Sequence, residues 1–130
     1  RLNDKMLYLE SASGNIEAAR WLQHKFPKVE IELCRFYSGV HIDSTIVPIR
    51  EGLVVVNASR VTKSNLPNVF NGWEVIWIDE VVEQGFYQYP YASKWIALNM
   101  LVVDPTTVIV DKHQTKIIQL EKLEKCYSQQ

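Results

Sequence analysis

The amino-acid sequence predicts an α/β fold in which short strands and helices follow one another along the chain. Two observations carry this prediction: segments of strand-like and helix-like periodicity alternate, and one strand–turn–strand segment occurs twice. The chain has 130 residues, 47% of them hydrophobic, so it can bury one core but is too short for two ordinary domains. We therefore expect residues 1–130 to form a single domain.

The alternation begins with the first residues. Lys5–Leu9 is a short run rich in Leu and Tyr, which is typical of a strand. Apolar residues at spacings of three and four then predict a helix over residues 16–26, with a capping segment at Ser13–Asn15 and an end at Pro27. Val29–Cys34 alternates apolar and polar side chains, as a half-buried strand does.

The rest of the chain carries two further groups of elements. The predicted elements are strands over residues 45–49 and 53–57, a weak helix over 59–70, a strand over 74–79, one helical turn over 93–98, strands over 99–103 and 108–111, and a final helix over 113–127. Arg50–Gly52 forms the first turn, and Pro67 interrupts the weak helix. Apolar side chains at helical spacing, from Ile117 to Tyr127, indicate the final helix.

A repeat becomes visible when the two strand pairs are aligned. Ile49–Asn57 superposes on Val103–Asp111 without a gap, and each second strand ends in Asn or Asp. A helical stretch is predicted after both pairs. Such self-similarity indicates about two stacked units, with helices packed on small mixed sheets, that bury their apolar faces against each other.

The composition excludes several classes of protein. Fourteen Lys and Arg against fifteen Asp and Glu give a net charge of −1 and no basic stripe, so we expect no nucleic-acid partner. The apolar runs are far shorter than the ~20 residues of a membrane helix, and we expect neither a membrane partner nor a signal peptide. Two cysteines do not form a disulfide scaffold, which favours the reducing cytoplasm.

The segment from Gly39 to Thr45 is the most informative for function. If it is extended, His41, Asp43 and Thr45 point to one side and can meet one ligand. Imidazole titrates near neutral pH and can move protons, and a carboxylate can hold a guanidinium by two hydrogen bonds. Arg60 is suited to a substrate carboxylate. The alternative interpretation is an exposed strand end and a loop cation without a ligand.

Two blocks of sequence connect this segment to a known family. His41–Thr45, with residues 52–57 and Arg60, resembles the arginine:glycine amidinotransferase family, and so does Ser93–Asp104 with the following Val110 and Asp111. The resemblance extends over about residues 15–123. It implies the pentein fold, an α/β propeller of β-β-α-β modules around a central active site, of which the repeat would be two neighbouring modules.

The resemblance also implies a site and a mechanism. In that family a cysteine thiolate attacks the guanidino carbon of a donor such as arginine, a histidine moves protons, and carboxylates hold the guanidinium. His41 matches the catalytic histidine. Asp43, Arg60 and Ser93 match positions that contact the donor, while Ala92 stands where the family often has a second serine.

The family's nucleophilic cysteine and the aspartate that orients its histidine match no residue of this sequence. The family has the cysteine in a glycine-rich segment beyond the final predicted helix, and the aspartate before the first matching block. Cys126 has no glycine-rich turn beside it, and Cys34 lies in a predicted strand, so we interpret both as non-catalytic thiols. The sequence therefore predicts a truncated, central fragment of an amidinotransferase-like chain.

We expect a non-catalytic binding or assembly protein that retains part of a guanidino pocket and binds an arginine-like ligand weakly. Two alternatives stay open: an active amidinotransferase, completed by a partner chain or by Cys126, and a degenerate reading frame without selected function. No cofactor and no metal are expected, since His24 and His113 have no ligand-spaced partners. Apolar strands with exposed edges predict a homodimer or a higher even oligomer, formed by residues 86–91 and the final helix.

Overall fold

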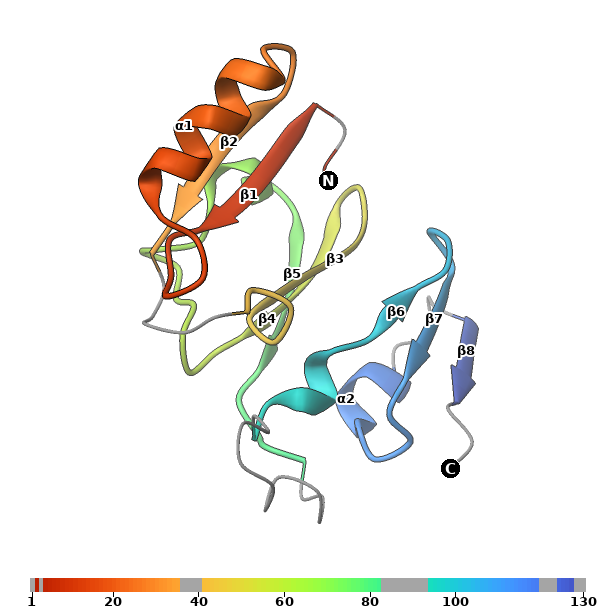
Figure 1. Ribbon diagram of the computed structural model, residues 1–130. Coiled ribbons are helices and arrows are strands. Elements are labelled where there is room, and N and C mark those ends of the chain that lie inside the picture. The colour runs from red at the N-terminus through yellow and green to blue at the C-terminus, as the bar shows by residue number, and fades with distance from the viewer. Residues whose placement is uncertain (1, 3, 36–40, 83–93, 120–123, 128–130) are drawn as a thin grey trace.

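The computed structural model describes the chain except for residues 1, 3, 36–40, 83–93, 120–123 and 128–130. In the described part, short strands form three small sheets that are accompanied by short helices, which confirms the predicted α/β class (Figure 1). The elements are β1 (Lys5–Leu9), α1 (Ile16–Lys25), β2 (Glu30–Cys34), β3 (Ile46–Arg50), β4 (Leu53–Asn57), the 3₁₀ turn η1 (Asn68–Phe70), β5 (Glu74–Ile78), the 3₁₀ turn η3 (Ile96–Leu98), β6 (Leu101–Val102), β7 (Thr107–Val110), α2 (Thr115–Ile118) and β8 (Glu124–Tyr127).

The first sheet consists of β1 and β2, which run parallel and are connected by α1. Asn15 caps the helix: its side-chain oxygen accepts a hydrogen bond from the backbone N–H of Ala18 at 3.0 Å. The helix ends at Lys25, one residue before the predicted end, because Pro27 cannot continue it. The sequence thus predicted this β-α-β segment within one residue at each boundary.

The other two sheets have the same topology, and we call them the first unit (β3, β4 and β5) and the second unit (β6, β7 and β8). In each unit the middle strand pairs antiparallel with the strand before it and parallel with the strand after it. Even the register repeats. Val54 lies opposite Pro48, and Val108, which is 54 residues further along, lies opposite Val102. The predicted repeat is therefore a structural repeat.

The two units differ in the crossover that connects the parallel strands. Leu53 pairs with Glu74, which is 21 residues later, and its counterpart Thr107 pairs with Glu124, which is 17 residues later. The second crossover is thus four residues shorter, while the pairing of the strands is unchanged. The sheet register is independent of the length of the crossover.

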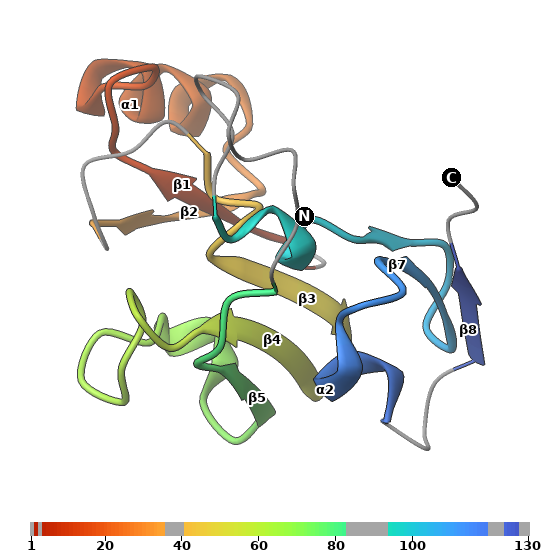
Figure 2. The ribbon, with the colours of Figure 1, turned by 90° about the horizontal axis from the view of Figure 1, so that it is seen from below.

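The units pack on one another through a shared core. The cluster that joins them contains Ile49, Leu53, Val55 and Ile78 from the first unit and Leu98, Val108, Val110 and Ile117 from the second unit and its flanking turns. Figure 2 shows the two sheets side by side. A second cluster, around Val54, Val56 and Phe70, receives Leu7 of β1. Arg50, the last residue of β3, donates a hydrogen bond to the carbonyl of Pro105 at 3.1 Å and connects the turns of the two units.

Two helix predictions are wrong. The segment 59–70 forms turns and the short η1 instead of a helix, since the side chain of Asn65 holds the backbone N–H of Thr62 in a turn at 2.6 Å. The segment 113–127 contains only the four residues of α2 as α-helix, and Glu124–Tyr127 is the strand β8. Pairing with the edge of β7 overrides the helical spacing of the apolar residues in β8.

Candidate functional site

The segment His41–Thr45 forms a turn, and the prediction of an extended strand is wrong here. The carbonyl of Ile42 accepts hydrogen bonds from the backbone N–H groups of Thr45 at 2.8 Å and Ile46 at 3.0 Å. His41 and Asp43 are exposed, whereas Thr45 is buried, so the three side chains do not share one face. The carboxylate of Asp43 accepts a hydrogen bond from the N–H of Ser44 at 2.9 Å, which closes the turn locally.

Arg60 is bound to this turn from the end of β4. Its Nη1 donates to Thr45 Oγ1 at 2.9 Å, to Ser44 Oγ at 3.1 Å and to the carbonyl of Ser44 at 3.4 Å. The hydroxyls of Ser44 and Thr45 are themselves buried. One turn therefore carries the carboxylate of Asp43 and anchors the guanidinium of Arg60.

The side chain of Asn57, the last residue of β4, holds the turn His41–Thr45 by a hydrogen bond. The sequence pattern gave this residue no functional role. It is fully buried, and its side-chain amide donates to the carbonyl of Ser44 at 3.1 Å. Its side-chain oxygen accepts from the N–H of Ser59 at 2.9 Å and from Ser59 Oγ at 2.6 Å, so every polar atom of the amide group is used at least once. The repeat did carry a signal, because both middle strands are followed or ended by Asn or Asp.

The counterpart in the second unit is Asp111, which makes the same local contact. Its carboxylate accepts from the backbone N–H of His113 at 2.8 Å and lies 3.1 Å from His113 Nδ1. Asn57 and Asp111 thus each hold the backbone two residues later. The polar residue at the end of the middle strand is part of the repeated turn.

The second unit reaches the turn through Asn99, which precedes β6. Its side-chain amide donates to the second carboxylate oxygen of Asp43 at 3.1 Å. Of the predicted site residues, the structure therefore brings Asp43 and Arg60 to one turn that also contains His41. The fourth predicted residue, Ser93, lies outside the described residues.

A further ion pair lies at the end of β5. Because β5 runs parallel to β4, Asp79 follows its strand at the same sheet edge as Asn57. Its carboxylate pairs with the ammonium group of Lys116 in α2. The hydrogen bond with Lys116 lowers the pKa of Asp79 and raises the pKa of Lys116, although both groups are solvent-exposed. The pair connects the first unit to α2 at this edge.

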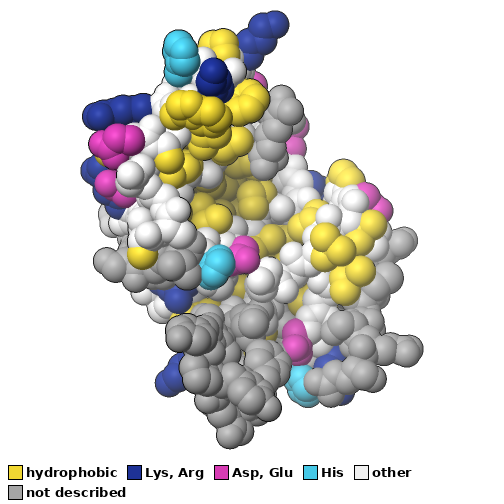
Figure 3. All heavy atoms as spheres, in the orientation of Figure 1, with side chains coloured by type: hydrophobic (Ala, Val, Ile, Leu, Met, Phe, Trp, Pro, Cys, Tyr) yellow, Lys and Arg dark blue, Asp and Glu magenta, His cyan; other side chains and the backbone are white. Residues whose placement is uncertain are grey.

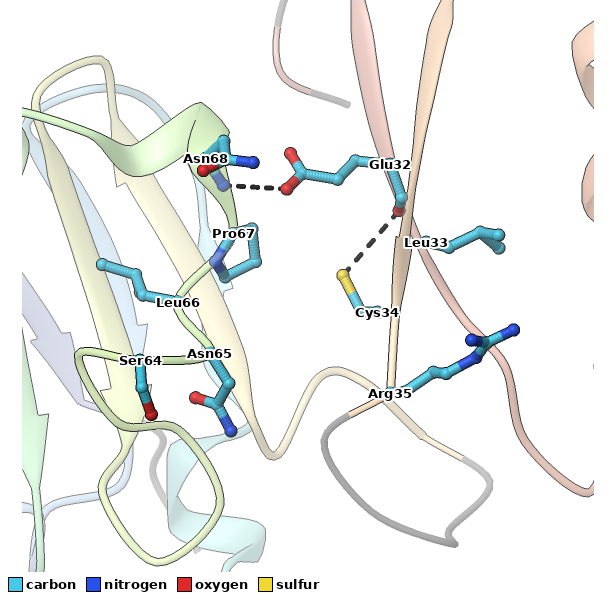
Figure 4. Close-up of a pocket in the computed structure, with 9 residues that line it drawn as sticks. All are labelled: Glu32, Leu33, Cys34, Arg35, Ser64, Asn65, Leu66, Pro67 and Asn68. Atoms are coloured by element: carbon cyan, nitrogen blue, oxygen red, sulfur yellow. Dashed lines mark hydrogen bonds between the residues drawn. The ribbon is translucent and has the colours of Figure 1, made fainter.

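A separate cavity of about 320 Å³ lies between the end of β2 and the loop over residues 64–68 (Figure 4). Glu32 and Cys34 point toward the loop, while Leu33 and Arg35 point away from it, as alternate residues of a strand do. The Glu32 carboxylate accepts from the backbone N–H of Asn68 at 2.8 Å and fastens η1 to β2. None of the predicted site residues lines this cavity, so we place the candidate site at the turn instead.

Cys34 faces the same cavity, but only 3% of its surface is exposed to solvent. Its thiol lies 3.8 Å from the carbonyl of Glu32. Burial, and to a smaller extent the negative charge of Glu32, raise the pKa of Cys34 to about 12. The thiol is therefore protonated at neutral pH and is not a nucleophile there.

This state of Cys34 can be tested by alkylation. In a Cys126→Ser chain, we expect iodoacetamide at pH 8 to modify the folded protein at least about a thousand times more slowly than the urea-unfolded one, because few thiols are ionised. The raised pKa favours the folded state below pH 9, and this contribution is lost as the pH rises toward 12. Similar rates for the folded and unfolded chains at pH 8 would contradict this assignment.

Other types of site find no support in the described part of the chain. No three His, Cys, Asp or Glu side chains there lie close enough to hold a metal ion. None of the described helices has the length and apolar character that a membrane span needs.

Known proteins similar to this chain were found by sequence and by structure. An inosamine-phosphate amidinotransferase of Streptomyces griseus is 44% identical over 123 residues, which is 92% of this chain and 35% of that protein. An L-arginine:L-lysine amidinotransferase of Pseudomonas savastanoi is 30% identical over 125 residues, 94% of this chain and 34% of that protein. The solved structure of an inosamine-phosphate amidinotransferase from Streptomyces griseus superposes with a TM-score of 0.86 at 40% identity, over 97% of this chain and 38% of that one.

These similarities confirm the resemblance and the pentein fold read from the sequence. No family model matches the chain. The chain spans about a third of the length of the curated relatives it matches.

Proposed function

We propose, from the homology of this chain to the amidinotransferases, that its His41–Thr45 turn and Arg60 form the part of an amidinotransferase-type site that binds a guanidino compound. Asp43 would hold the guanidinium, and Arg60 would meet the carboxylate of an amino-acid ligand. His41, two residues before Asp43 in the same segment, would carry protons, with Ser93 as a further ligand contact. The observation that supports this proposal is the anchoring of Asp43 and Arg60 to one turn.

For the chain by itself, we propose binding without catalysis. Amidino transfer through a covalent adduct needs a thiolate, and Cys34 is buried with its pKa raised to about 12. The turn is also open to solvent, since His41 and Asp43 are both exposed. A wet site weakens charge–charge interactions, so we expect an affinity in the millimolar range, on the order of −4 kcal/mol.

A second candidate function is amidino transfer itself, with the thiol supplied by a partner chain or by Cys126. The relatives favour it, because the proteins reported above are named amidinotransferases and extend over about three times the matched segment. In that case the same turn would bind the donor. A reducing cytoplasm, in which both cysteines stay thiols, is the setting that we propose for either role.

Binding is tested by titrating the purified chain with arginine while two-dimensional NMR monitors its backbone amides. We expect shifts around residues 41–45 and 60, and an affinity at least about tenfold weaker for Asp43→Asn, because the charged pair is lost. Glu74→Gln, an exposed carboxylate at the far end of β5, is the matched control and leaves the affinity unchanged. Ornithine released from arginine in the presence of an acceptor amine and a source of the thiol, above the level of a His41→Ala chain, would instead favour the catalytic candidate.

We also propose that the outer face of β6 associates with a second copy of the chain. Leu101 and Val103 are 61% and 55% exposed there, and hydrophobic side chains gather on this part of the surface (Figure 3). The repeat supports the proposal: of the equivalent residues of the first unit, Ile49 is buried in the cluster that joins the two units, and Val47 packs against that cluster. The predicted contact through residues 86–91 lies outside the described residues.

Sedimentation equilibrium tests this self-association. At micromolar concentration we expect a mass of twice 15.1 kDa or a higher even multiple, because burying the apolar face is favourable. Leu101→Lys should shift the mass toward the monomer, whereas Lys112→Leu, an exposed control after β7, should not. A monomer for the unmodified chain would contradict the proposal.

A further inference from the structure

The carboxylate of Asp43 is held from two sides by groups that lie far apart in the sequence. One oxygen accepts from the backbone N–H of Ser44 at 2.9 Å, within the turn. The other accepts from the side-chain amide of Asn99 at 3.1 Å, 56 residues away. Asn99 belongs to the segment between η3 and β6, so this second bond comes from the neighbouring unit.

We infer that Asn99 is a positioning residue that fixes the plane of the Asp43 carboxylate for a guanidinium ligand. The inference rests on the proposed function. An exposed carboxylate on a turn rotates about two side-chain bonds, but one hydrogen bond to each oxygen fixes both. Each oxygen accepts more than one hydrogen bond, so both keep a lone pair for the two parallel N–H groups of a guanidinium.

Asn99 can do this because it directly follows a residue that is anchored in the core. The preceding Leu98 is 1% exposed and belongs to the cluster that joins the two units. Its backbone N–H donates to the carbonyl of Trp95 at 3.0 Å, within η3. The orientation of the carboxylate therefore depends on how the second unit packs against the first.

A positioning role and a purely structural role make different predictions. If Asn99 only fastened two loops together, its loss would weaken all ligands of the site equally. If it orients the carboxylate, its loss weakens a charged guanidinium more than the neutral ureido group of the same shape, since only the former gains from the fixed charge. The ratio of the arginine and citrulline affinities is thus the informative quantity.

The experiment measures both affinities by NMR titration for the unmodified chain and for Asn99→Ala. We expect the preference for arginine over citrulline to fall by about three- to tenfold, the effect of one charge-assisted hydrogen bond. Asn99→Ser, which keeps a polar group but is too short to reach Asp43, should give the same fall and guards against a folding defect. In the Asp43→Asn background the substitution of Asn99 should leave the ratio unchanged.

Two controls complete the design. Arg60→Gln should weaken arginine and citrulline together, because both carry the same α-carboxylate. Asn71→Ala removes an exposed asparagine that lies before the first residue of β5, and it should change neither affinity.

An unchanged ratio of the arginine and citrulline affinities in Asn99→Ala, with normal binding by the unmodified chain, overturns the role of Asn99 alone. Absence of arginine binding by the unmodified chain overturns the proposed function and the inference with it.

Discussion

Replacing Asn57 with leucine should lower the free energy of unfolding by about 2 to 3 kcal/mol, although leucine has nearly the same shape. The amide of Asn57 is 0% exposed and makes three side-chain hydrogen bonds, to the carbonyl of Ser44 and to the N–H and hydroxyl of Ser59. Leucine leaves the buried carbonyl of Ser44 without that partner and removes the contact that holds the exposed Ser59. The midpoint of urea unfolding, followed by tryptophan fluorescence, should fall accordingly.

The repeat provides a matched control for this substitution. Asp111 makes the equivalent turn contact at the end of β7, but it is only half-buried, so water can replace it. We expect Asp111→Ala to cost no more than about 1 kcal/mol. The Asn57→Leu chain should in addition lose arginine-induced NMR shifts at residues 41–45, because its turn is no longer held. Equal losses of unfolding free energy in the two variants would show that the burial of Asn57 is not the reason why it stabilises the chain.

Replacing Ile117 with alanine should lower the free energy of unfolding by about 3 kcal/mol. Ile117 is 0% exposed and inserts from α2 into the cluster that joins the two units. A helix of four residues has little stability of its own, so packing of this side chain is what keeps α2 in place. The smaller side chain leaves a cavity between the units, and the urea midpoint should fall.

Leu101→Ala is the control for Ile117, because it removes a similar aliphatic side chain that is 61% exposed. At a protein concentration low enough to keep the chain monomeric, we expect a change within about 0.5 kcal/mol. A loss as large as that of Ile117→Ala would mean that the outer face of β6 is covered in the monomer. A negligible loss for Ile117→Ala would mean that the two units unfold independently.

The strands and their repeat were predictable from the sequence, because both units have the same local pattern of apolar strand residues and turn residues. The 54-residue offset of the aligned repeat also relates the pairs Val47–Val55 and Pro48–Val54 to Leu101–Ile109 and Val102–Val108. Asn15 and Pro27 likewise placed α1 within one residue at its end. These features depend on neighbours in the sequence, where periodicity and capping act.

The predictions failed where contacts between distant segments decide. The turn at His41–Thr45 is held by Asn57, the last residue of β4, and by Arg60, which follows this strand, and no pattern within the turn shows that. The sequence predicts a helix where the strand β8 lies, because its apolar spacing fits a helix, although its pairing with β7 repeats that of β5 with β4. The repeat would have corrected this prediction if the shorter second crossover had been allowed for. Asn99 was missed because its partner Asp43 belongs to the other unit.

The unequal crossovers indicate where this architecture accepts insertions and deletions. A shift of one residue within β4 would exchange the side chains that face the two core clusters, so we expect the strands to tolerate no change in length. The crossovers absorb a difference of four residues without disturbing either ladder. The exposed segment Thr62–Asn65 of the longer crossover is therefore the position at which a peptide tag or a foreign loop could be spliced into this chain while the strand pairing stays intact.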